Sequence, residues 1–219
     1  MRPSRDDLAA DRIKDQLEER MGASSMDVNV CVRDGIAHLQ GFVDVLAERI
    51  EAENIARQVP GVMKVENAIT ICTEGSINDK HIQKEIEMKL HSGDNNLARI
   101  NVDVNDGSAV LIGTVSNYAL EKQAIQLASG TRGVKNVVSN IRLENEGLFD
   151  DATINSRVAH ALSTTVLSLP DINTDTYNGE VTLSGWVRSN EEYALAEHTV
   201  SEVEGIRKVR NHLRVRSGH

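Results

Sequence analysis

Two kinds of apolar spacing alternate along the chain and recur in three rounds. Each round opens with apolar residues four positions apart, which predicts an amphipathic helix. These residues are Ala9, Ile13 and Leu17, then Ile82, Ile86 and Leu90, and then Ile154, Val158 and Leu162. Two runs of alternating apolar and polar residues follow, at 28–32 and 37–43 in the first round, and predict paired strands. A second helix and a closing strand complete each round, so the pattern reads helix, strand, strand, helix, strand.

The two strands of each round are joined by dipeptides that favour tight hairpins, since a type I′ turn needs positive φ at both central residues. These dipeptides are Asp34-Gly35, Asp106-Gly107 and Asn178-Gly179. A two-residue loop fixes the register of the first hairpin. The predicted pairs are Val32 with Ala37, Val30 with Leu39 and Val28 with Gly41. The second helix is expected to begin near side chains that can cap it, namely Asp44, Ser116 and Ser189.

Glycines recur at a spacing of 72 residues, which marks the rounds as internal repeats. The nine are Gly35, Gly41, Gly61, Gly107, Gly113, Gly133, Gly179, Gly185 and Gly205. The middle glycine of each repeat has inward parity, so we expect it to let the alanines of the second helix approach the sheet closely. The third glycine follows that helix and is expected to end it. The first helical set is offset by one residue from this spacing, which predicts an extra residue in the loop after it.

The sequence therefore predicts an α+β protein of three tandem αββαβ units. Their expected bounds are 1–75, 76–147 and 148–219. A strand, a helix and a strand in succession favour a right-handed crossover, with the second and third strands parallel. Each unit is then a small mixed three-stranded sheet with two helices on one face.

On these residues the chain resembles the BON domain, a bacterial module. The resemblance rests on the segments Leu39-x-Gly41-x-Val43 and Gly61-Val62-x-x-Val65 and on their copies in the other two units. The asparagine of the family pattern has its equivalents in Asn67 and Asn211, whereas the middle unit has Ser139. The resemblance implies non-catalytic association with phospholipid surfaces, or envelope maintenance, in osmotic or general stress. Relatives that respond to potassium imply a small-ion sensor as an alternative.

The net charge of -9, from 24 basic and 33 acidic residues, argues against a nucleic-acid partner. No stretch reaches transmembrane length, and the charged N-terminal segment has no apolar signal core. We therefore expect a cytoplasmic protein, or a periplasmic one only if an export signal has been removed. Two cysteines, Cys31 and Cys72, do not make a disulfide framework.

One local cluster of positive charge stands out against this acidic background. Basic residues occupy alternate positions of the last predicted strand, at Lys208, Arg210, His212, Arg214 and Arg216. At these alternate positions the side chains are expected to point away from the helices, and Trp186 is expected on the same outer face. Such a face can hold anionic phospholipid, with the tryptophan at the membrane interface. The alternatives are a solvated outer sheet face, a salt-bridged contact with the acidic first unit, and a protein-interaction scaffold without lipid affinity.

Other chemistry-bearing residues do not form a recognised motif. Cys31 is expected opposite His38, with Cys72 on the same parity, yet no closely spaced ligand pair supports a zinc site. Phe42 is expected to be partly exposed at the position equivalent to Trp186. The middle unit has an apolar outer face that needs cover, formed by Val110, Ile112 and Val138. Since no phosphate loop or nucleophile motif occurs, the sequence predicts neither an enzyme nor a cofactor or metal.

Overall fold

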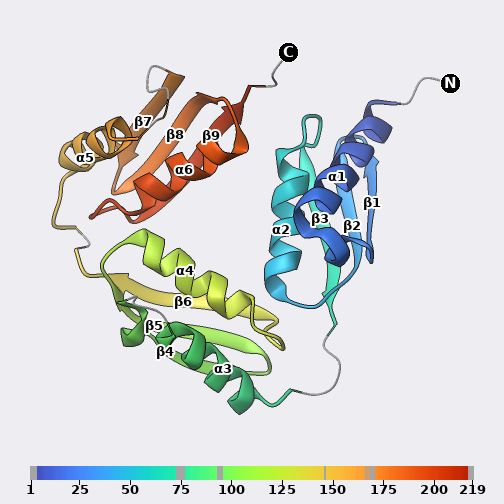
Figure 1. Cartoon of the computed structure of the whole chain (residues 1–219), viewed down its shortest axis with the longest axis horizontal. Helices are drawn as coiled ribbons and strands as arrows, with labels where there is room; N and C mark the ends of the chain where they lie inside the picture. Colours follow the sequence, from blue (N-terminus) through green and yellow to red (C-terminus); the bar gives the residue numbers. More distant parts are fainter. Residues whose placement is uncertain are drawn as a thin grey trace. The chain divides into compact units, whose positions relative to one another are not determined.

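The computed structural model describes residues 4–72, 77–92, 96–145, 147–165, 167 and 171–216. It confirms three αββαβ repeats, each with its own three-stranded sheet (Figure 1). Repeat 1 consists of α1 (Arg5–Met21), β1 (Val28–Arg33), β2 (Ile36–Val43), α2 (Leu46–Gln58) and β3 (Lys64–Ile71). Repeat 2 consists of α3 (Asp79–His91), β4 (Asn101–Asn105), β5 (Ser108–Val115), α4 (Tyr118–Ser129) and β6 (Asn136–Leu143). Repeat 3 consists of α5 (Asp151–Ser163), β7 (Ile172–Tyr177), β8 (Glu180–Val187), α6 (Asn190–Ser201) and β9 (Lys208–Val215).

Short 3-10 helices, Gly22–Ser25 and Asn96–Arg99, lead into β1 and β4. The unit boundaries expected at 75 and 147 stay predictions. Residue 75 lies outside the described part of the chain, and so does residue 146, next to the second boundary.

The hairpin turns have the conformation that their dipeptides predict. Both central residues have positive φ, 50° and 74° at Asp34 and Gly35, and the equivalent pairs agree within a few degrees. The register of β1 and β2 matches the prediction, with Val30 opposite Leu39. The central strand pairs antiparallel with its hairpin partner and parallel with the third strand in repeats 1 and 3. The mixed sheet and the parallel pairing of its second and third strands are thereby confirmed.

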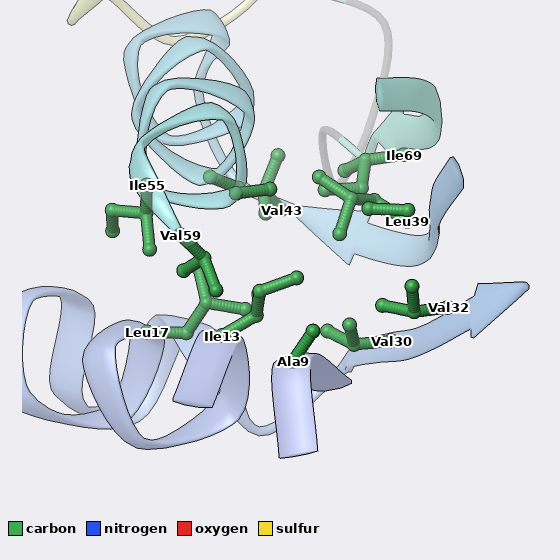
Figure 2. Close-up of a cluster of buried hydrophobic side chains, with 13 residues drawn as sticks. Ala9, Ile13, Leu17, Val30, Val32, Leu39, Val43, Ile55, Val59 and Ile69 are labelled. Carbon is green, nitrogen blue, oxygen red and sulfur yellow. The ribbon is translucent and has the colours of Figure 1, made fainter. Parts of the chain in front are cut away.

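Repeats 1 and 3 each bury an aliphatic core between the sheet and two helices. In repeat 1, side chains from both helices and from the sheet gather in one cluster, among them Ile13, Leu39 and Ile55 (Figure 2). Repeat 3 builds an equivalent cluster from Ile154, Leu183 and other aliphatic residues. Burial of this apolar surface is the main source of stability for each fold. Among the described residues, both helices of repeats 1 and 3 contribute to the core on one face of the sheet, and outward side chains of the other face, such as Phe42 and Trp186, are exposed.

The middle glycines are required for a reason other than the predicted one. A Cβ on Gly41 would lie 1.8 Å from the carbonyl oxygen of Asp27, and one on Gly185 would lie 2.0 Å from that of Asp171. At Gly113 the distance to the Arg99 carbonyl oxygen would be 2.4 Å. The close neighbour is therefore the backbone that leads into the first strand, and the prediction that helix alanines make this contact was wrong.

The third glycines, Gly61, Gly133 and Gly205, have φ of 103°, 89° and 91°. They lie in the turn three or four residues beyond the second helix, so they shape this turn and do not cap the helix itself.

The helix caps agree with the sequence in part. The Ser189 hydroxyl accepts a hydrogen bond from the Glu192 amide at 3.3 Å, as predicted. In repeat 2 the cap is Asn117, one residue after the predicted Ser116, and it accepts from the Leu120 amide at 3.0 Å. In repeat 1 the Asp44 side chain is not the cap. The N-cap is Val45, and the Glu48 carboxylate accepts from the Val45 amide at 3.3 Å, the reciprocal half of a capping box, and also from the Asp44 amide at 2.9 Å.

An aspartate in the first turn of each repeat's first helix anchors the hairpin, a feature that the sequence analysis missed. The Asp151 carboxylate accepts from the amides of Asn178 and Gly179 at 2.9 and 2.8 Å. The same pair of bonds joins Asp6 to the first turn and Asp79 to the second. Asp79 and Asp151 are 72 residues apart, whereas Asp6 carries the one-residue offset predicted for the first helix. In each hairpin the two central amides of the type I′ turn both donate to the same side chain. One carboxylate, with its two oxygens, can therefore accept both hydrogen bonds.

Candidate anion-binding face of repeat 3

The basic residues of β9 lie on the outer face of the third sheet. Lys208, Arg210, His212, Arg214 and Arg216 are all exposed. Val209 and Leu213, at the alternate positions, are buried in the core of repeat 3. The alternation follows from the pleat of a strand whose inner face packs on α6.

Two acidic residues neutralise part of this row. Glu180 lies opposite Lys208 in the sheet and accepts from Arg210 at 2.5 Å to Nε and 2.9 Å to Nη2, while Lys208 Nζ is 3.8 Å away. The hydrogen bond from Arg210 lowers the pKa of Glu180, so this carboxylate is ionised at neutral pH. At the other end of the strand, Arg216 pairs with Asp171 at 3.1 Å. Lys208, Arg210 and Arg216 thus already have anionic partners.

The remaining positive charge lies beside the tryptophan. Arg214 is the direct cross-strand neighbour of Trp186, and its guanidinium carbon lies 5.7 Å from the centre of the indole ring. Trp186 is 43% exposed. Across the described ranges, no carboxylate lies within ion-pair distance of Arg214 or His212. We call Trp186, His212 and Arg214 the aromatic-cationic corner.

The corner combines three groups suited to a phosphate at an apolar boundary. A guanidinium held over an indole face by a cation–π contact keeps its N–H edge free for bidentate binding of phosphate oxygens. The indole itself has an apolar body and a polar N–H, which favours a membrane interface. His212 adds a donor on the same strand face, two residues from Arg214.

The equivalent positions of the other repeats lack this combination. Repeat 1 pairs Phe42 with Thr70, and Phe42 is 57% exposed. Repeat 2 has Thr114 and Arg142 at the positions that correspond to Trp186 and Arg214. A cation and an aromatic ring therefore meet at this position in repeat 3 and not in its two copies.

The other two outer faces differ in chemistry. In repeat 1, Cys31 lies directly opposite His38, as predicted, and both Cys31 and Cys72 are free and exposed. Within the described ranges, no three His, Cys, Asp or Glu side chains are arranged to hold a metal ion. In repeat 2, Ile112 and Val138 are 48% and 40% exposed and Val110 is half-buried, so its outer face is apolar as expected.

The asparagine of the resemblance is a structural residue. The Asn67 side chain donates to the Arg49 carbonyl at 3.0 Å and accepts from the Ile69 amide at 3.1 Å, which ties β3 to α2. Asn211 makes the same links in repeat 3. In repeat 2 the Ser139 hydroxyl donates to the Glu121 carboxylate at 2.7 Å, which keeps one such link between β6 and α4. None of the helices in the described ranges combines the length and the apolar character needed to cross a membrane.

Comparison with known proteins gives consistent similarities. The BON domain family profile matches three segments, residues 5–73, 78–145 and 150–217. The osmotically-inducible protein Y of Escherichia coli (strain K12) is 30% identical over 138 residues, which cover 60% of this chain and 69% of that protein. A 21 kDa hemolysin of Actinobacillus pleuropneumoniae is 30% identical over 117 residues, covering 51% of this chain and 60% of the hemolysin.

Solved structures are more distant. CdsD, a structural protein of the type III secretion system of Chlamydia trachomatis, is 15% identical with a TM-score of 0.29, and the match covers 95% of this chain and 92% of CdsD.

Proposed function

The chain belongs to the BON domain family, and from this premise we propose that it is a non-catalytic binding protein that attaches to anionic phospholipid surfaces through the aromatic-cationic corner of repeat 3. The names of its relatives, an osmotically-inducible protein and a hemolysin, support a role at the cell envelope under osmotic or general stress. The cytoplasmic location expected from the sequence is part of this proposal, and cell fractionation tests it.

The observation that carries the proposal is the state of Arg214. In a chain of net charge -9, its guanidinium lies over Trp186 without a carboxylate partner among the described residues, whereas Lys208, Arg210 and Arg216 each have one. A basic side chain near an anionic membrane surface contributes about 1 kcal/mol to binding. Since Trp186 can enter the interface beside it, the corner supplies an apolar and an electrostatic contribution at one point.

Flotation of the full chain with vesicles tests this proposal. Vesicles of phosphatidylglycerol and phosphatidylcholine should carry the protein upward at low salt, and pure phosphatidylcholine should not. Raising the salt to 1 M should weaken flotation, because the Debye length falls from about 10 Å at 0.1 M to about 3 Å.

The chain offers a matched control for the charge itself. Arg214→Glu should abolish flotation, whereas Arg142→Glu, the same change at the equivalent exposed position of repeat 2, should leave it nearly intact. Equal losses in both variants would mean that net charge, and not the corner, drives binding. Absence of flotation of the unaltered chain at low salt would contradict the proposal.

A protein-interaction scaffold is the second candidate, and the outer face of repeat 2 favours it. Ile112 on β5 and Val138 on β6 are 48% and 40% exposed. If the unaltered chain ignores anionic vesicles, this apolar face becomes the leading binding surface.

A further inference from the structure

A row of chemically complementary side chains crosses the outer face of the first sheet. Cys31 on β1 lies opposite His38 on β2, and His38 lies opposite Glu66 on β3. His38 Nδ1 is 3.2 Å from the Glu66 carboxylate, which Lys64 Nζ also contacts at 2.8 Å. The hydrogen bond from Lys64, with a smaller contribution from His38, lowers the pKa of Glu66, so it stays ionised.

The contact between Nδ1 and Glu66 leaves the second nitrogen of the imidazole available to accept a proton. A carboxylate at Nδ1 favours the neutral tautomer with its proton on Nδ1, which leaves Nε2 as an acceptor. Side chains directly opposite each other in an antiparallel pair have Cβ atoms about 5 Å apart, so Cys31 and His38 are direct cross-strand neighbours. The order across the sheet is thiol, imidazole, carboxylate and ammonium.

The thiol also borders a shallow hollow of about 310 Å³. The polar side chains around it are Asn29, Arg33, His38 and Gln40. Arg33 lies two residues from Cys31 on the same exposed strand face and is a ready partner for a carboxylate. The hollow therefore suits a small anionic molecule held next to an exposed thiol.

We propose that Cys31 is a site of thiol–disulfide exchange with small disulfides that carry carboxylates. His38 takes the proton of the Cys31 thiol, and the thiolate attacks one sulfur of the bound disulfide. A new S–S bond joins Cys31 to one half of the molecule, and the S–S bond of the small disulfide breaks. The other half leaves as a thiolate and takes the proton from His38, so the protein thiol is oxidised as the departing half is reduced.

The row is specific to repeat 1. The equivalents of Cys31, His38 and Glu66 are Asp103, Val110 and Val138 in repeat 2, and Asp175, Thr182 and Arg210 in repeat 3. Cys72 provides an internal reference, since it is also free and exposed but follows the end of β3, six residues beyond Glu66. Any reactivity due to exposure alone should be shared by both thiols.

Incubation of the reduced full chain with oxidised glutathione tests the proposal, with mass spectrometry of the two cysteine peptides as the readout. Cys31 should form the mixed disulfide at least about tenfold faster than Cys72, since positioned proton transfer accelerates the step. His38→Gln should lower the Cys31 rate to that of Cys72 with the circular dichroism spectrum unchanged. Arg33→Gln should slow reaction with oxidised glutathione but not with the uncharged hydroxyethyl disulfide.

Equal rates at the two cysteines would overturn the proposal. An unchanged Cys31 rate in His38→Gln would overturn the role of the imidazole. These outcomes are independent of vesicle binding, which concerns repeat 3.

Discussion

Replacement of Gly113 by alanine isolates the effect of one backbone contact. The added Cβ would lie 2.4 Å from the Arg99 carbonyl oxygen and 3.0 Å from the Ile100 Cα, so the lead-in to β4 must shift. Gly113 does not have positive φ, unlike its equivalents Gly41 and Gly185, and the substitution therefore adds a clash without backbone strain. Overpacking of this kind costs about 1–3 kcal/mol. The lost stability should be confined to repeat 2.

Hydrogen exchange followed by mass spectrometry reads each repeat separately, with repeats 1 and 3 as internal references. A loss of about 1–3 kcal/mol should speed exchange of the β4 and β5 amides roughly 5- to 150-fold. Gly130→Ala is the matched control in the same repeat, because its Cβ would meet its nearest atom, the Gln126 carbonyl oxygen, at 3.3 Å. Unchanged exchange in Gly113→Ala, or the same acceleration in Gly130→Ala, would refute the carbonyl contact as the reason for this glycine.

Two further changes probe the anchors and the ion pairs of repeat 3. Asp151→Ala removes the acceptor of both turn amides and should destabilise repeat 3 by about 1–3 kcal/mol. Hydrogen exchange of the β7–β8 hairpin should then be faster. Asp79→Ala should have the same effect on the hairpin of repeat 2. Glu180→Gln should release Arg210 and Lys208 and raise the vesicle-bound fraction at a given lipid concentration; a lower fraction would contradict the view that Glu180 shields the row. Because Arg210 lowers the pKa of Glu180, the contribution of this pair to stability is present at neutral pH and is lost only as the pH falls through the lowered value. Acid titration followed by circular dichroism should therefore show a smaller loss on the acid side for Glu180→Gln than for the unaltered chain.

The fold was predictable because local chemistry and long-range pattern agree at each step. Asp34-Gly35 sets a type I′ turn, the turn sets the pairing of Val30 with Leu39, and the pairing sets which face is buried. The 72-residue period then extends one repeat to all three. The outward parity of the β9 bases follows from the same pleat.

The sequence alone did not predict the interactions in which a side chain contacts a residue on another strand or helix. Glu180 is 30 residues from Arg210, and only the parallel register of β8 and β9 brings them together. The bond from Asp151 to the Asn178 turn depends on how the first helix lies on the hairpin. An aspartate recurring at 79 and 151 was the available signal, and comparison of the repeats position by position would have found it.

The emission of Trp186 tests the central claim most directly, because it is the only tryptophan of the chain and lies at the corner itself. On titration with phosphatidylglycerol vesicles at low salt, the account predicts a blue shift as the indole leaves water for the membrane interface. Phosphatidylcholine vesicles should not produce the shift, and Arg214→Glu should prevent it. An emission maximum that stays constant while the protein floats with anionic vesicles would place the contact elsewhere and contradict the account.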